Sequence, residues 1–223
     1  MALSRHRQLP DAVAGHVREQ IMAGNLRPGE FLRMEPIAEA VGVSITPVRE
    51  GLLRLSSEGF VHAVPRRGFV VAEFTRQDIR DLFWVQSQLA GELAARAAVR
   101  RTDDELAELH ELMLQCEQAI AGSDTDALTG VGRLFHRRIN LSAASDHLAR
   151  LYASIVNHLP DSFYSSIEAR VRTVAPDHRE LYAAIEARDA ELAREIGTRH
   201  IAGNADFVIA LLEERGIWLD HPA

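Results

Sequence analysis

Residues 36–60 contain the feature that most constrains the fold. The segment PIAEAVG (36–42) has helical spacing and ends at Gly42, and Ser44 is placed to cap a second helix with Pro47 in its first turn. An apolar segment, Phe60–Val64, follows. A helix, a tight turn, a second helix and then a strand are the elements of a winged helix-turn-helix, which places its second helix in the DNA major groove.

The flanking segments extend this prediction to residues 1–75. Asp11 can cap a helix in which Val13, Val17 and Ile21 share one face, and Gly24 would end it. Two strands are predicted at Phe60–Val64 and Phe69–Ala72, and the segment PRRG (65–68) would join them as a β-wing. Residues 1–75 are therefore predicted to form a winged helix-turn-helix DNA-binding domain.

The pattern from residue 76 onward is helical throughout. Thr75 with Asp78 would start a long helix, and Thr102 with Glu105 forms a capping box for the next. Further helices are predicted at 124–143, 146–158, 161–171, 176–188 and 190–214. The predicted fold class is mainly α, with the N-terminal winged helix-turn-helix followed by a C-terminal all-α bundle of six or seven helices over residues 76–223.

Charge is distributed unevenly between these parts. The whole chain carries a net charge of −7, but residues 1–75 hold nine Arg and eight Asp or Glu, whereas residues 76–223 hold 16 Arg and 24 Asp or Glu. DNA would thus be bound by a few placed arginines. Cys116 is the single cysteine, so no intrachain disulfide is expected. With neither a signal peptide nor a membrane span in the sequence, we expect a cytoplasmic protein.

Candidate DNA-binding residues lie on the second helix and on the wing. Ile45 and Arg49 are four residues apart and share a face, beside Thr46. An arginine can fork onto guanine, and a threonine can bond phosphate or meet a thymine methyl group. The alternative is that these arginines are solvated surface charges. The predicted set is Arg33, Ser44, Ile45, Thr46, Arg49, Arg66, Arg67 and Gly68.

The run GNLRPGEFL…IAEAVGVSITPVREGLLRLSSEGFV…RRGFVV resembles the N-terminal domain of GntR-family transcription regulators. It departs from the family pattern at Ile45, where Arg is usual, and at Gly51, where Ala is usual. Ile45 could pack on a thymine methyl group, so the operator sequence cannot be taken from the family. Gly51 inside a helix should cost about 1 kcal/mol relative to Ala.

Three histidines of the helical part stand out by their apolar neighbours: His136, His178 and His200. They fall on three different predicted helices, and no local metal-binding motif contains any of them. Spacing alone therefore does not make them a site, because a helical histidine is more often a core or surface residue than a ligand.

Residues 76–215 resemble the all-helical FCD-type effector domain of the FadR branch of this family. The family pattern D-x-x-x-H reads here Gly132…His136, while His178 before AIEARD and His200, 22 residues later, both match. The resemblance implies that His136, His178 and His200 bind a divalent metal, Zn²⁺ or Ni²⁺. The fourth ligand of the pattern, a carboxylate, is missing at Gly132.

A second departure concerns the effector pocket. The family pattern V-R-x-x-L-E reads VQSQLA here, with Gln86 in place of an arginine that pairs with a carboxylate effector. We expect effector oxygens to bind the metal directly, in the space that Gly132 leaves open, with Gln86 as a neutral hydrogen-bond donor. Tyr164 and Asn204 complete the predicted effector-binding residues.

The resulting functional prediction is a ligand-responsive DNA-binding transcription regulator. Two chains would pair on an inverted-repeat operator, and a small carboxylate bound at the metal-containing pocket would release a repressor. Two alternatives remain: a metal-responsive regulator, and a metal-free regulator that binds an apolar acyl-type ligand. A hydrolytic zinc centre would also use three histidines. No acidic residue beside them is an obvious general base, so we expect no enzyme.

Overall fold

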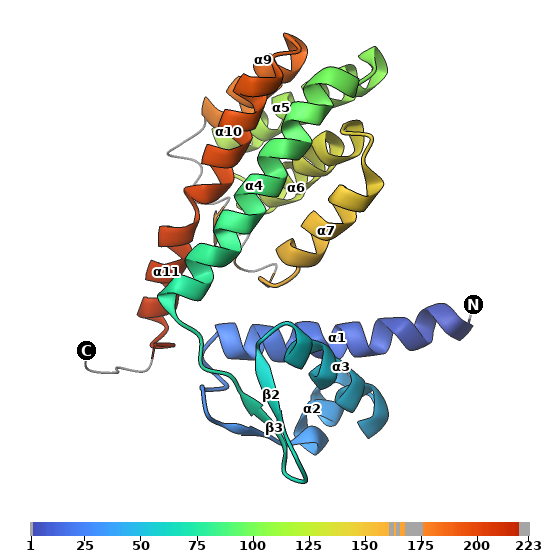
Figure 1. Ribbon diagram of the computed structural model, residues 1–223, viewed down its shortest axis with the longest axis vertical. Helices are drawn as coiled ribbons and strands as arrows, with labels where there is room; N and C mark the ends of the chain where they lie inside the picture. The colour runs from blue at the N-terminus through green and yellow to red at the C-terminus, as the bar shows by residue number, and fades with distance from the viewer. Residues whose placement is uncertain (1, 161–162, 164–165, 168–175, 219–223) are drawn as a thin grey trace. The chain divides into compact units, whose positions relative to one another are not determined.

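The computed structural model describes residues 2–160, 163, 166, 167 and 176–218 and divides into two compact units (Figure 1). The first unit comprises Met1–Asp78 together with Ile209–Ala223, and the second comprises Ile79–Val208. The chain is mainly α-helical, as predicted, with one small sheet. The C-terminal residues group with the first unit, whereas the predicted domains assigned them to the bundle. Among the described residues, no helix is both long and apolar enough to cross a membrane.

The first unit has the elements of a winged helix-turn-helix: α1 (Ala2–Met22), β1 (Phe31–Leu32), α2 (Met34–Val41), α3 (Ile45–Ser57), β2 (Val61–Val64) and β3 (Gly68–Val71). The antiparallel sheet has the order β1-β3-β2. Two-residue β1 was not predicted because it is too short to show alternation. Asp11 does not cap α1, which begins earlier in the chain; it pairs with Arg54 of α3 instead.

The turn between α2 and α3 forms as predicted. Gly42 adopts the left-handed conformation, with φ of 72°, and the Val43 amide donates to the Ala38 carbonyl at 2.9 Å. Ser44 occupies the N-cap position of α3, although its hydroxyl makes no capping hydrogen bond. Because Val48 and Leu52 are buried in the core of this unit, the opposite side of α3 faces outward.

Gly51 lies where α3 packs most closely on α1. A Cβ atom at this position would come within 2.8 Å of the Pro10 carbonyl oxygen and of Val13 Cγ1. The expectation that glycine is a simple loss relative to alanine is therefore wrong for this fold. The packing of α1 on α3 requires a residue without a side chain here.

The second unit is built from the helices α4 (Arg76–Arg100), α5 (Asp103–Gly122), α6 (Thr125–Ser142), α7 (Asp146–Val156), α9 (Pro176–Glu186) and α10 (Ala190–Ala202). All but α7 contribute to the larger apolar core, and Tyr152 of α7 packs in a smaller cluster with Leu93 and Ala143. The capping box of Thr102 and Glu105 is confirmed at the start of α5. The helix predicted at 190–214 is two helices, α10 and α11 (Ala205–Glu214), with the break at Gly203 and Asn204. The helix predicted at 161–171 falls mostly outside the described residues.

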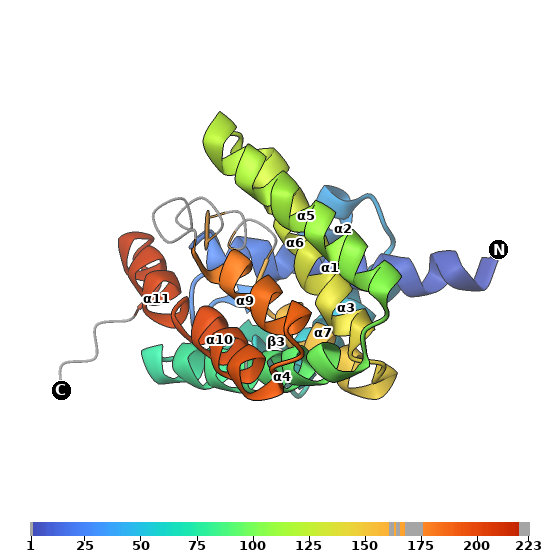
Figure 2. The same ribbon diagram turned by 90° about the horizontal axis from the view of Figure 1, so that it is seen from above.

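Two glycines allow α4 and α10 to pack very closely (Figures 1 and 2). A Cβ on Gly91 of α4 would lie 2.8 Å from the Arg194 carbonyl oxygen, and a Cβ on Gly197 of α10 would lie 3.3 Å from Gly91 Cα. This contact sets the position of α10 one turn before His200. It also brings His200 to the side of the bundle that Gln86 of α4 occupies.

Candidate metal centre and effector cavity

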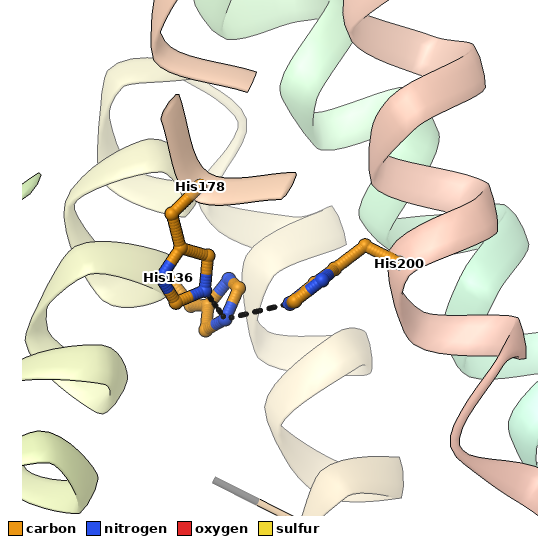
Figure 3. A group of neighbouring side chains, drawn as sticks. All are labelled: His136, His178 and His200. Carbon is orange, nitrogen blue, oxygen red and sulfur yellow. Dashed lines mark hydrogen bonds between the residues drawn. The ribbon is translucent and has the colours of Figure 1, made fainter. Parts of the chain in front are cut away.

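Three imidazoles from three helices converge on one point (Figure 3). His136 comes from α6, His178 from α9 and His200 from α10. The Nε2 atom of His136 lies 3.3 Å from Nε2 of His178 and 3.3 Å from Nε2 of His200. His178 and His200 are buried, and one nitrogen from each of the three rings lies within 4.8 Å of the others. The structure thus brings together the three residues that sequence spacing alone could not connect.

A carboxylate holds one of these rings from behind. Asp177 Oδ2 lies 3.1 Å from His200 Nδ1, and this hydrogen bond is the main cause that lowers the pKa of Asp177. An ionised carboxylate accepts, so the Nδ1 atom of His200 carries the proton and its Nε2 atom presents a lone pair to the centre. A carboxylate behind a metal-binding histidine is a recurrent feature of metal sites.

Without a cation, neutral rings cannot form hydrogen bonds at both Nε2–Nε2 contacts of His136, with His178 and with His200. If His136 Nε2–H donates to His200, no proton lies between His136 and His178. If His178 Nε2–H donates to His136, two lone pairs face each other between His136 and His200. A metal that accepts all three lone pairs removes this conflict. The two separations of 3.3 Å from His136 Nε2 also equal the edge of a tetrahedron with metal–nitrogen distances of about 2.0–2.1 Å, and the remaining pair lies within 4.8 Å. The residues therefore fit a divalent metal.

Burial keeps two of the ligand rings, those of His136 and His178, neutral. It is the largest cause that lowers the pKa of His136 well below its usual value, and the neighbouring histidines add to the effect. Burial likewise lowers the pKa of His178 to about 3. Since metal binding requires the neutral imidazole, these rings are already in the form that binds a cation at neutral pH.

A cavity of about 770 Å³ adjoins the triad, and His136 and His200 form part of its wall. Its wall comes from α4, α6, α7 and the α10–α11 connection, together with residues that follow α7. A volume of roughly 300–1,000 Å³ is typical of pockets that enclose a drug-sized ligand. The cavity is thus large enough to hold an effector against His136 and His200.

The predicted effector residues differ in where they lie. Gln86 lines the cavity with an exposed fraction of 1%, and its Nε2 atom has no hydrogen-bond partner among the residues that the structure describes. Asn204 also lines it and donates to the His200 carbonyl at 3.2 Å. Gly132 is buried on α6, one turn before His136, and is not among the residues that line the cavity. We therefore do not carry forward the expectation that effector oxygens occupy the space beside Gly132. Tyr164 lies outside the described residues.

Several lining residues were missed by sequence reasoning. Asn140 and Tyr152 lie beside the histidines, and Arg137 and Arg150 lie on the exposed sides of α6 and α7. Asp177 was also missed, although it is the sequence neighbour of His178. Helical periodicity places these residues on faces, but only the packing of the helices decides which faces meet.

The predicted DNA-binding residues of α3 and the wing occupy the surface of the first unit. Arg33, Ser44, Ile45, Thr46 and Arg49 are exposed, and so are Arg66 and Arg67. Arg66 has a φ of 64° and Gly68 a φ of 102°, which together make the tight tip of the wing. The Arg67 guanidinium lies 4.5 Å from the centroid of the Phe31 ring, which holds it against β1.

Comparisons with known proteins cover both units. Residues 9–71 match the family described as bacterial regulatory proteins, gntR family, and residues 81–203 match the FCD domain. The HTH-type transcriptional regulator McbR of Escherichia coli K12 is 30% identical over 200 residues, which are 88% of each chain. The probable D-xylose utilization operon transcriptional repressor of Paenarthrobacter nicotinovorans is 27% identical and covers 85% of this chain and 86% of its own.

The fold is also similar to a solved structure. The structure described as E. coli McbR/YncC aligns with a TM-score of 0.67 and 29% identity, and the alignment covers 93% of this chain and 98% of the other. The matching families and the named relatives are transcription regulators, not enzymes.

Proposed function

Since this chain belongs to the GntR family, as a DNA-binding transcription regulator with an FCD effector domain, we propose that its DNA affinity is controlled by a small carboxylate bound at a metal-containing pocket. The observation that carries the proposal is the convergence of three imidazoles within the FCD domain, two of which, His136 and His200, line a large cavity. The regulator acts on bacterial DNA and is accordingly assigned to the cytoplasm.

The pocket residues have separate roles. His136, His178 and His200 hold the divalent metal, Zn²⁺ or Ni²⁺, and Asp177 fixes the orientation of His200. The bound metal supplies positive charge and at least one open coordination position for a carboxylate oxygen. Gln86 donates its unpartnered amide N–H to the same carboxylate. A buried donor without a partner costs free energy, so an effector that accepts from it gains affinity.

DNA is read by α3 and the wing. Ile45, Thr46 and Arg49 contact base edges, while Ser44 and Arg33 contact the backbone near the start of α3 and α2. The wing contributes Arg66, Arg67 and Gly68. Two copies of the chain pair on an inverted repeat, because two-fold symmetric regulators bind half-sites of matching symmetry. The repressor description of the Paenarthrobacter relative supports repression as the basal state.

The test begins with the operator, which is selected from a random duplex library with the purified full chain. Fluorescence anisotropy then measures operator affinity for the Zn²⁺-loaded protein with and without a panel of small carboxylates. We expect a carboxylate to weaken operator binding. His178→Ala should bind the operator normally but lose this response.

Two outcomes would replace the proposal with its alternatives. Operator affinity that changes with metal or EDTA when no organic ligand is present indicates a metal-responsive regulator. A ligand response that survives both EDTA and His178→Ala indicates a metal-free pocket for apolar acyl-type ligands.

A further inference from the structure

We propose that the cavity contains a second anion-binding subsite, formed by Arg137 of α6 and Arg150 of α7, for the distal end of the effector. The effector is then an acid that carries a second anionic group at the far end of an apolar chain. This inference rests on the proposed function, because it assigns the far end of the molecule whose near end meets the histidines.

Helical geometry places the two arginines away from the histidines. Successive residues of a helix are about 100° apart. On α6, His136 lies on the inner side and is half-buried, whereas its neighbour Arg137 is exposed. On α7, Tyr152 is buried and Arg150, two residues earlier, is exposed. All four side chains line the same cavity, whose wall is therefore more buried at His136 and Tyr152 and more exposed at the two arginines.

The charge of the lining is unusual for this chain. The described lining residues include Arg133, Arg137 and Arg150 but one acidic residue, Asp146, although the whole chain has a net charge of −7. Neither Arg137 nor Arg150 has an ion-pair partner in the described part of the chain. By contrast, other arginines of the second unit are paired with carboxylates, among them Arg138, Arg179, Arg194 and Arg199. Two exposed, unpaired guanidinium groups in the lining of one cavity suit an external anion.

Much of the cavity wall is apolar. Phe83, Val156, Leu159 and Ile167 are among the residues that form it. A short acid would leave most of the 770 Å³ to water. A chain of methylene groups would instead bury apolar surface along this wall, and a second anionic group would reach the arginines.

The experiment compares matched acids on the Zn²⁺-loaded full chain by isothermal titration calorimetry. The probes are straight-chain monocarboxylates and α,ω-dicarboxylates of about six to twelve carbons, lengths suited to a drug-sized cavity. At the best length, we expect the dicarboxylate to bind about tenfold more tightly than the monocarboxylate. Acids with a terminal phosphonate distinguish a phosphate-type distal group from a carboxylate, and a gain from either supports the subsite.

Substitution of the arginines tests whether they cause the tighter binding of the dicarboxylate. Arg137→Gln and Arg150→Gln should each remove most of it while the monocarboxylate affinity stays the same, which also shows that the variant is folded. Arg80→Gln is the matched control, because Arg80 pairs with Asp206 and does not line the cavity. It removes one positive charge and should preserve the gain.

Two results would overturn the subsite alone: equal binding of both acids at every length, or a gain that Arg137→Gln and Arg150→Gln leave intact. In either case metal-dependent binding of the monocarboxylates would leave the proposed function standing. Failure of every acid to bind would overturn both.

Discussion

Asp177 Oδ2 accepts a hydrogen bond from Nδ1 of His200 at 3.1 Å, so the aspartate directs the Nε2 lone pair of that ring at the other two histidines. Asp177 itself comes one residue before His178 at the start of α9. A short segment of α9 thus supplies one ligand and orients a second ligand on another helix. The resulting arrangement is a three-histidine centre with one supporting carboxylate.

Asp177→Asn should lower metal affinity by about 10- to 100-fold, because loss of the partner of a ligating histidine weakens its orientation and basicity. Competition with a chromophoric chelator measures this affinity. Glu180→Gln is the control, since Glu180 is exposed on the same helix and pairs with Arg199. Equal affinities for Asp177→Asn and wild type would show that Asp177 has no role in the site.

His178→Ala should abolish stoichiometric metal binding. Elemental analysis of the wild-type protein, loaded with metal and then desalted, should give about one metal equivalent per chain, because each chain has one three-histidine site. His62→Ala, at an exposed position on β2, should retain it. Metal retained by His178→Ala would place the ion elsewhere.

The metal-free protein should lose stability as the pH falls below about 6.5. The folded chain holds His178 neutral, with a pKa of about 3, whereas the unfolded chain takes up a proton near 6.5. Acid therefore favours unfolding between these two values, by at most about 1.4 kcal/mol per pH unit for this group, and stability above pH 7 is unaffected by it. Urea denaturation at several pH values measures the slope, which His178→Gln should reduce. An unchanged slope in that variant would assign the acid sensitivity to other groups.

Gly51→Ala should destabilise the protein by about 1–3 kcal/mol despite the higher helix propensity of alanine, because the added methyl group overpacks the α1–α3 contact. Gly15→Ala is a matched control on α1, where a Cβ would meet nothing within 4 Å, and it should be neutral or stabilising. Thermal denaturation of both variants separates packing from propensity. Stabilisation by Gly51→Ala would contradict the close approach.

Arg49→Ala should weaken binding to the selected operator by about 1–3 kcal/mol and relax discrimination at one base pair of each half-site. Anisotropy titrations against operators changed at single positions measure both effects. Arg66→Ala should instead weaken all duplexes alike and reduce the salt dependence, as expected of a phosphate contact. Loss of affinity without any change in base preference would show that Arg49 contacts a phosphate and not a base.

Local signals predicted the elements of the fold well. The capping box at Thr102 and Glu105 and the turn at Gly42 both form where the sequence places them, because each depends on a few neighbouring residues. The break between α10 and α11 was missed, since the apolar spacing continues through Gly203 and Asn204. The start of α1 was misplaced because Asp11 looks like a cap but serves as the partner of Arg54.

The candidate site was predicted in part. Family resemblance identified the histidines, and Gln86 and Asn204 do line the cavity. Asp177, Arg137 and Arg150 gave no signal, because their roles depend on which faces of separate helices meet. That information resides in tertiary packing and not in local periodicity.

Because of the glycine contact between α4 and α10, substitutions outside the pocket can also impair the response to the effector. A side chain added at Gly91 would meet the backbone of α10 at 2.8 Å and displace that helix, whereas one added at Gly197 would tighten the contact by a few tenths of an ångström, and His200 moves with α10. Such a substitution alters neither a ligand atom nor a cavity-lining charge. In a saturation scan that scores effector response, these two positions should therefore group with the histidines, and tolerance to alanine there would mark the helices as free to shift.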